Sequence, residues 1–188
     1  MLDEKPDRPL AIVKSAYNAK RVGFWKTGGG NNNGYAALIG DTKLAIEKAK
    51  AQGITLHPRA LVWCQGESDA RSQGASHDPV MYRETLESMI PALRKDLDAP
   101  ELIALLGFNT KFGKRWSKVS SPRPGVMKIH GAQIQIAENC IYTERVEDWG
   151  CQVVNAAHFG AAGTLELGKC YAEALLQTEE NLKCSKEE

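Results

Sequence analysis

Two polar segments of this sequence carry residue types that do chemistry in enzymes. The first covers residues 65–69, Gln-Gly-Glu-Ser-Asp, which bring an amide, two carboxylates and a hydroxyl within five positions. The second is centred on His158, with Asn155 three residues before it. Carboxylates and imidazoles transfer protons, and activated hydroxyls attack electrophilic carbons. These two segments are therefore the candidates for a catalytic site, if the fold brings them together.

The element that must position the first segment is a short apolar run. Residues 59–64, Arg-Ala-Leu-Val-Trp-Cys, are rich in β-favouring types and contain no turn former, as in a strand buried on both faces of a parallel sheet. Ligands of open α/β sheets bind beyond the carboxyl ends of the strands. The polar residues after Cys64 therefore lie where chemistry is expected, although a polar exit from a strand into a loop is the plain alternative.

The rest of the chain alternates between predicted strands and helices. The strands are expected at Leu10–Ala16, Arg59–Cys64, Leu102–Phe108 and Cys140–Thr143. The helices are expected at Tyr35–Gln52, from Asp78-Pro79 to Leu97, Val126–Glu138 and Thr164–Gln177. This order predicts a three-layer α/β/α domain with a mostly parallel sheet and helices on both faces. The charged tail, residues 178–188, is expected to fray.

Apolar spacing predicts which faces of two helices are buried. In the helix after Pro79, the inward stripe comprises Tyr82, Leu86, Met89, Ile90, Leu93 and Leu97. In the last helix, the residues expected to face inward are Leu165, Gly168, Tyr171, Ala172 and Leu175. Irregular loops are expected at Gly28–Gly34 and Thr110–Gly125. His158 falls between a predicted strand and the last helix, on a loop that can reach the carboxyl edge of the sheet.

Composition narrows the class of protein. With 188 residues, of which 43% are hydrophobic and 25% charged, the sequence predicts one globular domain. The net charge of +1 and the dispersed basic residues predict no nucleic-acid partner. Five widely spaced cysteines without a Cys-x-x-Cys pair favour reduced thiols in a cytosolic setting and no metal site. No apolar run is long enough for a membrane span and the start is charged, so neither a membrane partner nor a signal peptide is predicted.

The two polar segments resemble the sialate O-acetylesterase and acetyl xylan esterase group, carbohydrate esterase family 6 of the SGNH hydrolase superfamily. The resemblance rests on the Gln-Gly-Glu block within Trp63–Asp69 and on the histidine block, Asn155–Gly163, followed by Leu167–Ala172. It runs from roughly Leu10 to Leu176. It implies a flavodoxin-like fold and the removal of acetyl groups from carbohydrates without a cofactor, so the expected partner is an acetylated carbohydrate.

The resemblance also assigns roles to residues. It implies that His158 is the catalytic base and that residue 155, an aspartate in the family, orients it. Asn155 can accept the imidazole hydrogen bond but brings no charge. Glu67 either supplies that charge or is a buried carboxylate that accepts backbone N–H groups. Gln65 is expected to donate its amide to the oxyanion or the substrate.

Three further residues, Trp25, Asn18 and Gly66, are expected to bind substrate. Asp148 and Glu147 are the other acids that could orient His158. If both blocks belong to one site, Glu67 or Gln65 and His158 should converge at the carboxyl edge of the sheet.

The nucleophile that the family uses is missing. The family's serine lies in a Gly-Gln-Ser-Asn block after an N-terminal strand, and this sequence has no such block. Two interpretations stay open: an esterase domain that lacks its N-terminal strand, which is central in the family, or a relative that has lost the chemistry. In the first case one strand edge should be exposed and apolar.

Three other interpretations compete with this one. Residues 66–70 approximate an α/β-hydrolase elbow with Ser68 as nucleophile, although a loop is expected soon after the serine, where the elbow needs a helix. The glycines at Gly28–Gly34 suggest a phosphate-binding loop, but the stretch lacks the Lys-Ser/Thr that such a loop requires. A non-catalytic carbohydrate-binding relative would use Trp25, Trp116 and the asparagines at 31–33.

Overall fold

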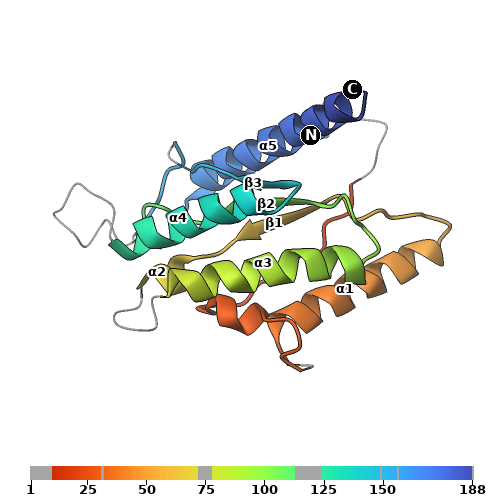
Figure 1. Ribbon diagram of the computed structural model, residues 1–188, viewed down its shortest axis with the longest axis horizontal. Helices are drawn as coiled ribbons and strands as arrows, with labels where there is room; N and C mark the ends of the chain where they lie inside the picture. Colours follow the sequence, from red (N-terminus) through yellow and green to blue (C-terminus); the bar gives the residue numbers. More distant parts are fainter. Residues whose placement is uncertain are drawn as a thin grey trace.

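The computed structural model describes residues 10–30, 32–71, 78–112, 124–148, 150–155 and 157–187. Within them, the chain forms a parallel sheet with strand order β1-β2-β3 (Figure 1). The strands are β1 (Ala60–Cys64), β2 (Ile103–Gly107) and β3 (Thr143–Arg145). The central strand, β2, is buried along its whole length.

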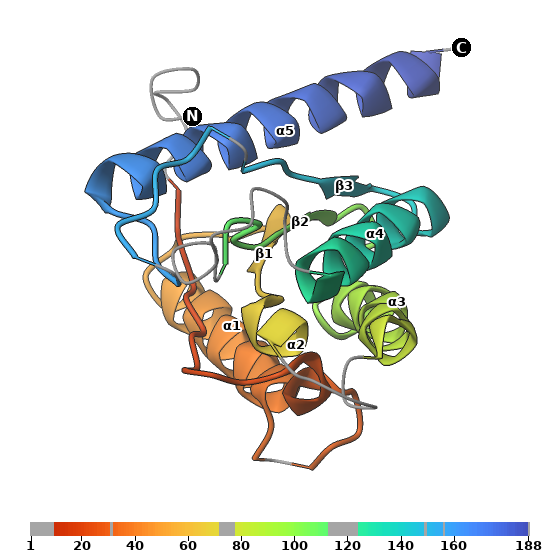
Figure 2. The ribbon, with the colours of Figure 1, turned by 90° about the vertical axis from the view of Figure 1, so that its left-hand side faces the viewer.

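Helices cover both faces of this sheet. One face carries α1 (Gly34–Lys50), α3 (Pro79–Asp96) and α4 (Pro124–Asn139), with the short η1 (Val22–Trp25) and α2 (Glu67–Arg71) at one end. The other face carries α5 (Ala161–Glu187), which lies across the sheet in Figure 2. Alternate residues of β2 therefore enter different clusters: Ala104 and Leu106 pack towards α3 and α4, while Ile103 and Leu105 pack towards α5. The predicted three-layer α/β/α fold is confirmed.

The helix predicted after Pro79 forms as expected. The carboxylate of Asp78 accepts a hydrogen bond from the Val80 backbone N–H at 2.9 Å, and Pro79 occupies the first turn. Pro91 lies inside this helix without ending it. Five of the six predicted inward residues are at most 2% exposed and Leu97 is partly buried: Tyr82, Leu86, Met89, Ile90, Leu93 and Leu97. α1 forms close to its predicted range, and the residue before it, Asn33, caps the helix because its side-chain oxygen accepts the backbone N–H of Ala36.

The predicted first strand, Leu10–Ala16, is wrong. These residues form no strand or helix in the structure, and Ile12 is 89% exposed. A strand requires a neighbour to complete its hydrogen-bond ladder, and among the described residues this segment has none. β1 is consequently an edge strand, and Val62, at its centre, is 54% exposed.

Two other boundaries differ from the predictions. The fourth strand was expected at Cys140–Thr143 but begins only at Thr143, because Tyr142 has a positive φ of 52° and ends a turn. The last helix does not fray after residue 177 but continues to Glu187. Its later part is held to the sheet because the Arg59 guanidinium makes a double hydrogen bond with the Glu179 carboxylate.

The buried stripe of α5 is shifted from the predicted one. Leu167, Tyr171 and Leu175 are buried at i, i+4 and i+8, whereas Leu165 is 70% exposed and Gly168 is also exposed. The prediction was right for Tyr171 and Leu175 and wrong for Leu165 and Gly168. None of the described helices is long and apolar enough to cross a lipid bilayer. Trp116 and most of the predicted loop at 110–125 lie outside the described residues.

Candidate active site

The end of β1 is anchored from two helices. The backbone carbonyl of Gln65 accepts a hydrogen bond from the Tyr82 hydroxyl of α3 at 2.7 Å and one from the Gln133 amide of α4 at 3.3 Å. The Gln65 N–H donates to the Gly107 carbonyl at the end of β2. Gly66 follows, and a Cβ there would lie 2.9 Å from the side chains of Ile129 and Phe108. Only glycine lets the chain pass this close to the core.

The Gln65 side chain donates its hydrogen bonds to groups inside the protein. Its amide nitrogen donates to the Asp69 carboxylate at 2.5 Å and to the Lys20 carbonyl at 3.3 Å. Both amide hydrogens are therefore taken, and the structure offers none to an oxyanion. The amide oxygen, by contrast, is buried and has no hydrogen-bond partner among the described residues. Asp69 also accepts the Val22 backbone N–H at 3.1 Å, which ties η1 to α2.

Glu67 has the second of its two predicted arrangements, that of a carboxylate that accepts backbone N–H groups. Its carboxylate accepts the backbone N–H of Asn109, just after β2, at 2.8 Å. Burial raises the pKa of this carboxyl above its usual 4.5, and hydrogen bonds from backbone N–H groups, first that of Asn109, oppose the shift. Glu67 therefore joins the exit of β1 to the exit of β2.

This pKa shift predicts how stability depends on pH. A carboxyl whose pKa is higher in the folded state holds its proton more tightly there, so the folded state loses stability as pH rises above the unfolded pKa, about 4.5. We expect the free energy of unfolding of the natural chain, minus that of Glu67→Gln, to fall as pH rises above about 4.5. Urea titrations of both proteins at several pH values measure this difference. A difference that stays constant or rises would contradict the assignment.

The histidine block places Asn155 directly against His158. The Asn155 side-chain oxygen lies 3.1 Å from His158 Nδ1. The same oxygen accepts the backbone N–H groups of Ala157 and His158 at 2.8 and 2.9 Å. Because two backbone donors meet this atom, it is the oxygen of the amide and an acceptor. The proton of the neutral imidazole therefore lies on Nδ1, which leaves the lone pair of Nε2 available in an exposed side chain.

Sequence reasoning missed the residue that joins the two blocks, Asn109. It is 1% exposed, its N–H donates to Glu67, and its side-chain amide donates to the Ala157 carbonyl at 3.2 Å. The Gln-Gly-Glu block and the histidine block are thus linked through one residue after β2. The signal that identified Gln65, a polar side chain just beyond a buried strand, would also have identified Asn109.

The other acids near His158 in sequence have different partners. The Asp148 carboxylate, 1% exposed, accepts the backbone N–H of Thr110 at 2.9 Å and the Thr110 hydroxyl at 2.5 Å. Glu147 lies 3.1 Å from the His130 ring. The first contact joins Asp148 to the segment after β2, and the second joins Glu147 to α4. Neither acid takes the place beside His158 Nδ1 that Asn155 occupies.

Several predicted site residues lie elsewhere. Trp25 is 6% exposed and packs edge to face on Trp63 at a ring-centroid distance of 5.0 Å, so its ring fills the core and not a sugar-binding surface. Asn18 is exposed in a turn. Ser68 is the second residue of α2, inside the helix and not in a turn before it. The described residues contain no group of three or more His, Cys, Asp or Glu side chains arranged to hold a metal ion.

Comparisons with known proteins identify a family and a related fold. The family model "Carbohydrate esterase, sialic acid-specific acetylesterase" matches residues 1–177. The fold resembles that of an Arabidopsis thaliana protein whose X-ray structure was determined at 1.6 Å, with a TM-score of 0.61 and 23% identity. That match covers 84% of this chain and 57% of the length of the Arabidopsis protein. No curated protein matches the chain. With two linked polar blocks at the carboxyl edge of an α/β/α sheet and a family match over residues 1–177, the chain belongs to the sialic acid-specific acetylesterase family of carbohydrate esterases.

Proposed function

We propose that this chain is the base-bearing part of an acetylesterase that acts on acetylated carbohydrates, with His158 as general base and Asn155 as the residue that orients it. The observation that carries the proposal is the contact between Asn155 Oδ1 and His158 Nδ1 at 3.1 Å. It leaves Nε2 as the acceptor for a proton from an attacking hydroxyl, as the reaction requires.

The chemistry divides between this base and a nucleophile. A serine oxygen attacks the acetyl carbonyl while Nε2 takes the serine proton, and Nε2 then returns the proton to the departing sugar hydroxyl. Water attacks the acetyl-serine with the same base, and acetate leaves. Asn155 holds the tautomer through both steps but cannot stabilise the imidazolium by charge. In a serine protease with a Ser-His-Asp triad, the change of this acid to its amide lowers turnover by about 10⁴.

The outer edge of β1, which pairs with no described strand, offers a position for a strand that carries the serine. β1 has no neighbour on its outer side among the described strands, and Gln65 at its carboxyl end carries a buried amide oxygen without a partner in the described part of the chain. The segment at 10–17, which forms no helix or strand, contains a second such atom, the Ser15 hydroxyl. A serine-bearing strand paired with β1 would supply N–H groups to this edge and end near Gln65. We therefore propose that the nucleophile reaches the site on such a strand.

The chain by itself should hydrolyse p-nitrophenyl acetate no faster than about tenfold above the buffer rate, because its sequence lacks the family's Gly-Gln-Ser-Asn block. Asn155→Asp and His158→Ala should each change this rate by less than about threefold, since residues of one catalytic unit do not act additively. Steady-state turnover of the three proteins measures this. Strong activity that disappears in His158→Ala would place the nucleophile within this chain, and Ser68→Ala would then be the next variant.

A further inference from the structure

Two cysteines lie against each other next to the histidine block. Cys151, between β3 and this block, is fully buried, whereas Cys170, in α5, is half-buried. Cys151 belongs to the apolar cluster between α5 and the sheet, and Cys170 packs against that cluster. The two thiols make a side-chain hydrogen bond with each other, and both are free thiols in the structure. The proposed esterase chemistry uses neither of them.

The segment between the two cysteines carries the histidine block. Val153 and Phe159 pair in an antiparallel bridge, and the Val154 N–H donates to the His158 carbonyl at 3.0 Å. These contacts form a small hairpin, and α5 begins directly after it. A covalent bond between the two cysteines would therefore close a loop that contains the hairpin and the first turns of α5.

The two thiols differ in their access to solvent. Burial, followed by the neighbouring Cys170 thiol, raises the pKa of the Cys151 thiol to about 11. The Lys111 ammonium, whose Nζ donates to the Cys151 carbonyl, opposes this shift. Exchange with a disulfide needs a thiolate that the disulfide can reach. Cys170 is therefore the thiol that meets a reagent from solvent, and Cys151 is placed to react second.

We propose that Cys151 and Cys170 form a reversible disulfide by exchange with a low-molecular-weight disulfide such as oxidised glutathione. The Cys170 thiolate attacks one sulfur of the small disulfide, whose S–S bond breaks and releases a thiolate that takes up a proton. The Cys151 thiolate then attacks the Cys170 sulfur of the mixed disulfide and releases the second small thiol. The two cysteines lose two electrons and two protons, and the small disulfide gains them as two thiols.

The bond should stabilise the histidine block. A cross-link restricts the unfolded chain, and the midpoint of thermal unfolding of a chain of this size should rise by about 5–10 °C. The bond also ties the hairpin to α5. The Val154 N–H should therefore exchange with solvent at least about tenfold more slowly in the oxidised protein. Neither effect depends on the esterase activity.

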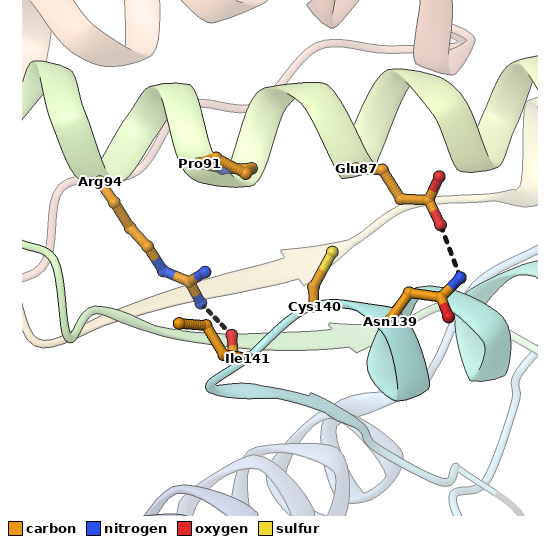
Figure 3. Close-up of a pocket in the computed structure, with 6 residues that line it drawn as sticks. All are labelled: Glu87, Pro91, Arg94, Asn139, Cys140 and Ile141. Carbon is orange, nitrogen blue, oxygen red and sulfur yellow. Dashed lines mark hydrogen bonds between the residues drawn. The ribbon is translucent and has the colours of Figure 1, made fainter.

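Cys140 provides the matched control. Like Cys170 it is half-buried, and it lines a surface cavity together with Glu87 and Arg94 (Figure 3). Of the described residues that line this cavity, Cys140 is the only cysteine. A glutathione adduct on Cys140 therefore meets no second thiol within the cavity that could displace it.

The test treats the full chain with oxidised glutathione at about pH 8, where cysteines ionise in part, and then alkylates the remaining thiols. Peptide mass spectrometry should find Cys151 joined to Cys170 in the natural chain and in Cys140→Ser. Both proteins should gain about 5–10 °C in the unfolding midpoint, and dithiothreitol should reverse the gain. Cys170→Ser should show neither the bond nor the gain. Cys151→Ala should stop at a glutathione adduct on Cys170.

Three results would overturn the proposal. The first is a glutathione adduct on Cys170 that persists in the natural chain without a bond to Cys151. The second is an oxidised natural chain that unfolds at or below the midpoint of the reduced chain, since the bond would then strain the fold. The third is an equal gain in the unfolding midpoint in Cys170→Ser, which would assign the stabilisation to other cysteines.

Discussion

Fusion of a strand that carries Gly-Gln-Ser-Asn ahead of Leu10 should raise p-nitrophenyl acetate turnover by at least about 10³ over the unaltered chain. The reason is that His158 Nε2, held by the 3.1 Å contact from Asn155 to Nδ1, then has a hydroxyl to deprotonate. Removal of the nucleophile or the base from a complete serine site costs about 10⁶ in turnover. A gain of about 10³ is thus a modest expectation for a fused strand. Steady-state kinetics of the fusion and the unaltered chain measure it.

The matched control is the same fusion with alanine in place of the serine, which should stay at the rate of the unaltered chain. In the serine fusion, Asn155→Asp should add up to about 10⁴ because a charge then faces the imidazolium. Hydrogen exchange of the β1 amides reports strand pairing independently of the rate. A fusion that protects β1 but gains no activity, or an alanine fusion as active as the serine one, would refute the proposed site.

Gly163→Ala should destabilise the protein by about 3 kcal/mol. Gly163 is buried in the first turn of α5, where an added Cβ would overlap the carbonyl oxygen of Gln152 and lie 2.9 Å from its nitrogen. The obstacle is backbone, so α5 or the loop before it must shift. That loop carries His158, whose carbonyl accepts the Val154 N–H at 3.0 Å. The substitution should therefore also disturb the contact between His158 and Asn155.

Gly168→Ala is the control for Gly163→Ala. Gly168 lies in the same helix, and an added Cβ there meets nothing within 4 Å. Alanine favours a helix over glycine by about 1 kcal/mol, so this variant should be slightly more stable than the natural chain. Urea unfolding of both variants gives the comparison, and equal stability of the two would contradict the close packing of α5 on Gln152.

Local spacing explains what could be predicted from the sequence. α3 was predicted because its cap, its N-terminal proline and its apolar stripe all act within a few residues of one another. The contact between Asn155 and His158 was implied by the family resemblance, which places the residue that orients the histidine three positions before it. The fold class followed from the alternation of strands and helices, which leaves a parallel sheet few topologies.

Contacts between distant residues explain what was missed. Asn109 joins Glu67, 42 positions away, to Ala157, 48 positions away, and no local pattern indicates either contact. The roles of Gln65 and Trp25 were misjudged because amides and indoles suit both ligand binding and internal packing. Their partners, Asp69 and Lys20 for Gln65 and Trp63 for Trp25, are known only from the structure.

The family and the three-layer fold could be predicted from short motifs and hydrophobic periodicity, because these are local properties of the chain. The contact between Asn155 and His158 could be predicted from the resemblance of the histidine block to the family. The structure was needed to show which polar side chains form hydrogen bonds inside the protein and which face of α5 is buried. It was also needed to show that Leu10–Ala16 pairs with no strand among the described residues. Those outcomes depend on the neighbour that each segment meets. Whether a segment forms a strand, which acceptor a donor meets and which helix face is buried all depend on a partner that lies far away in the sequence.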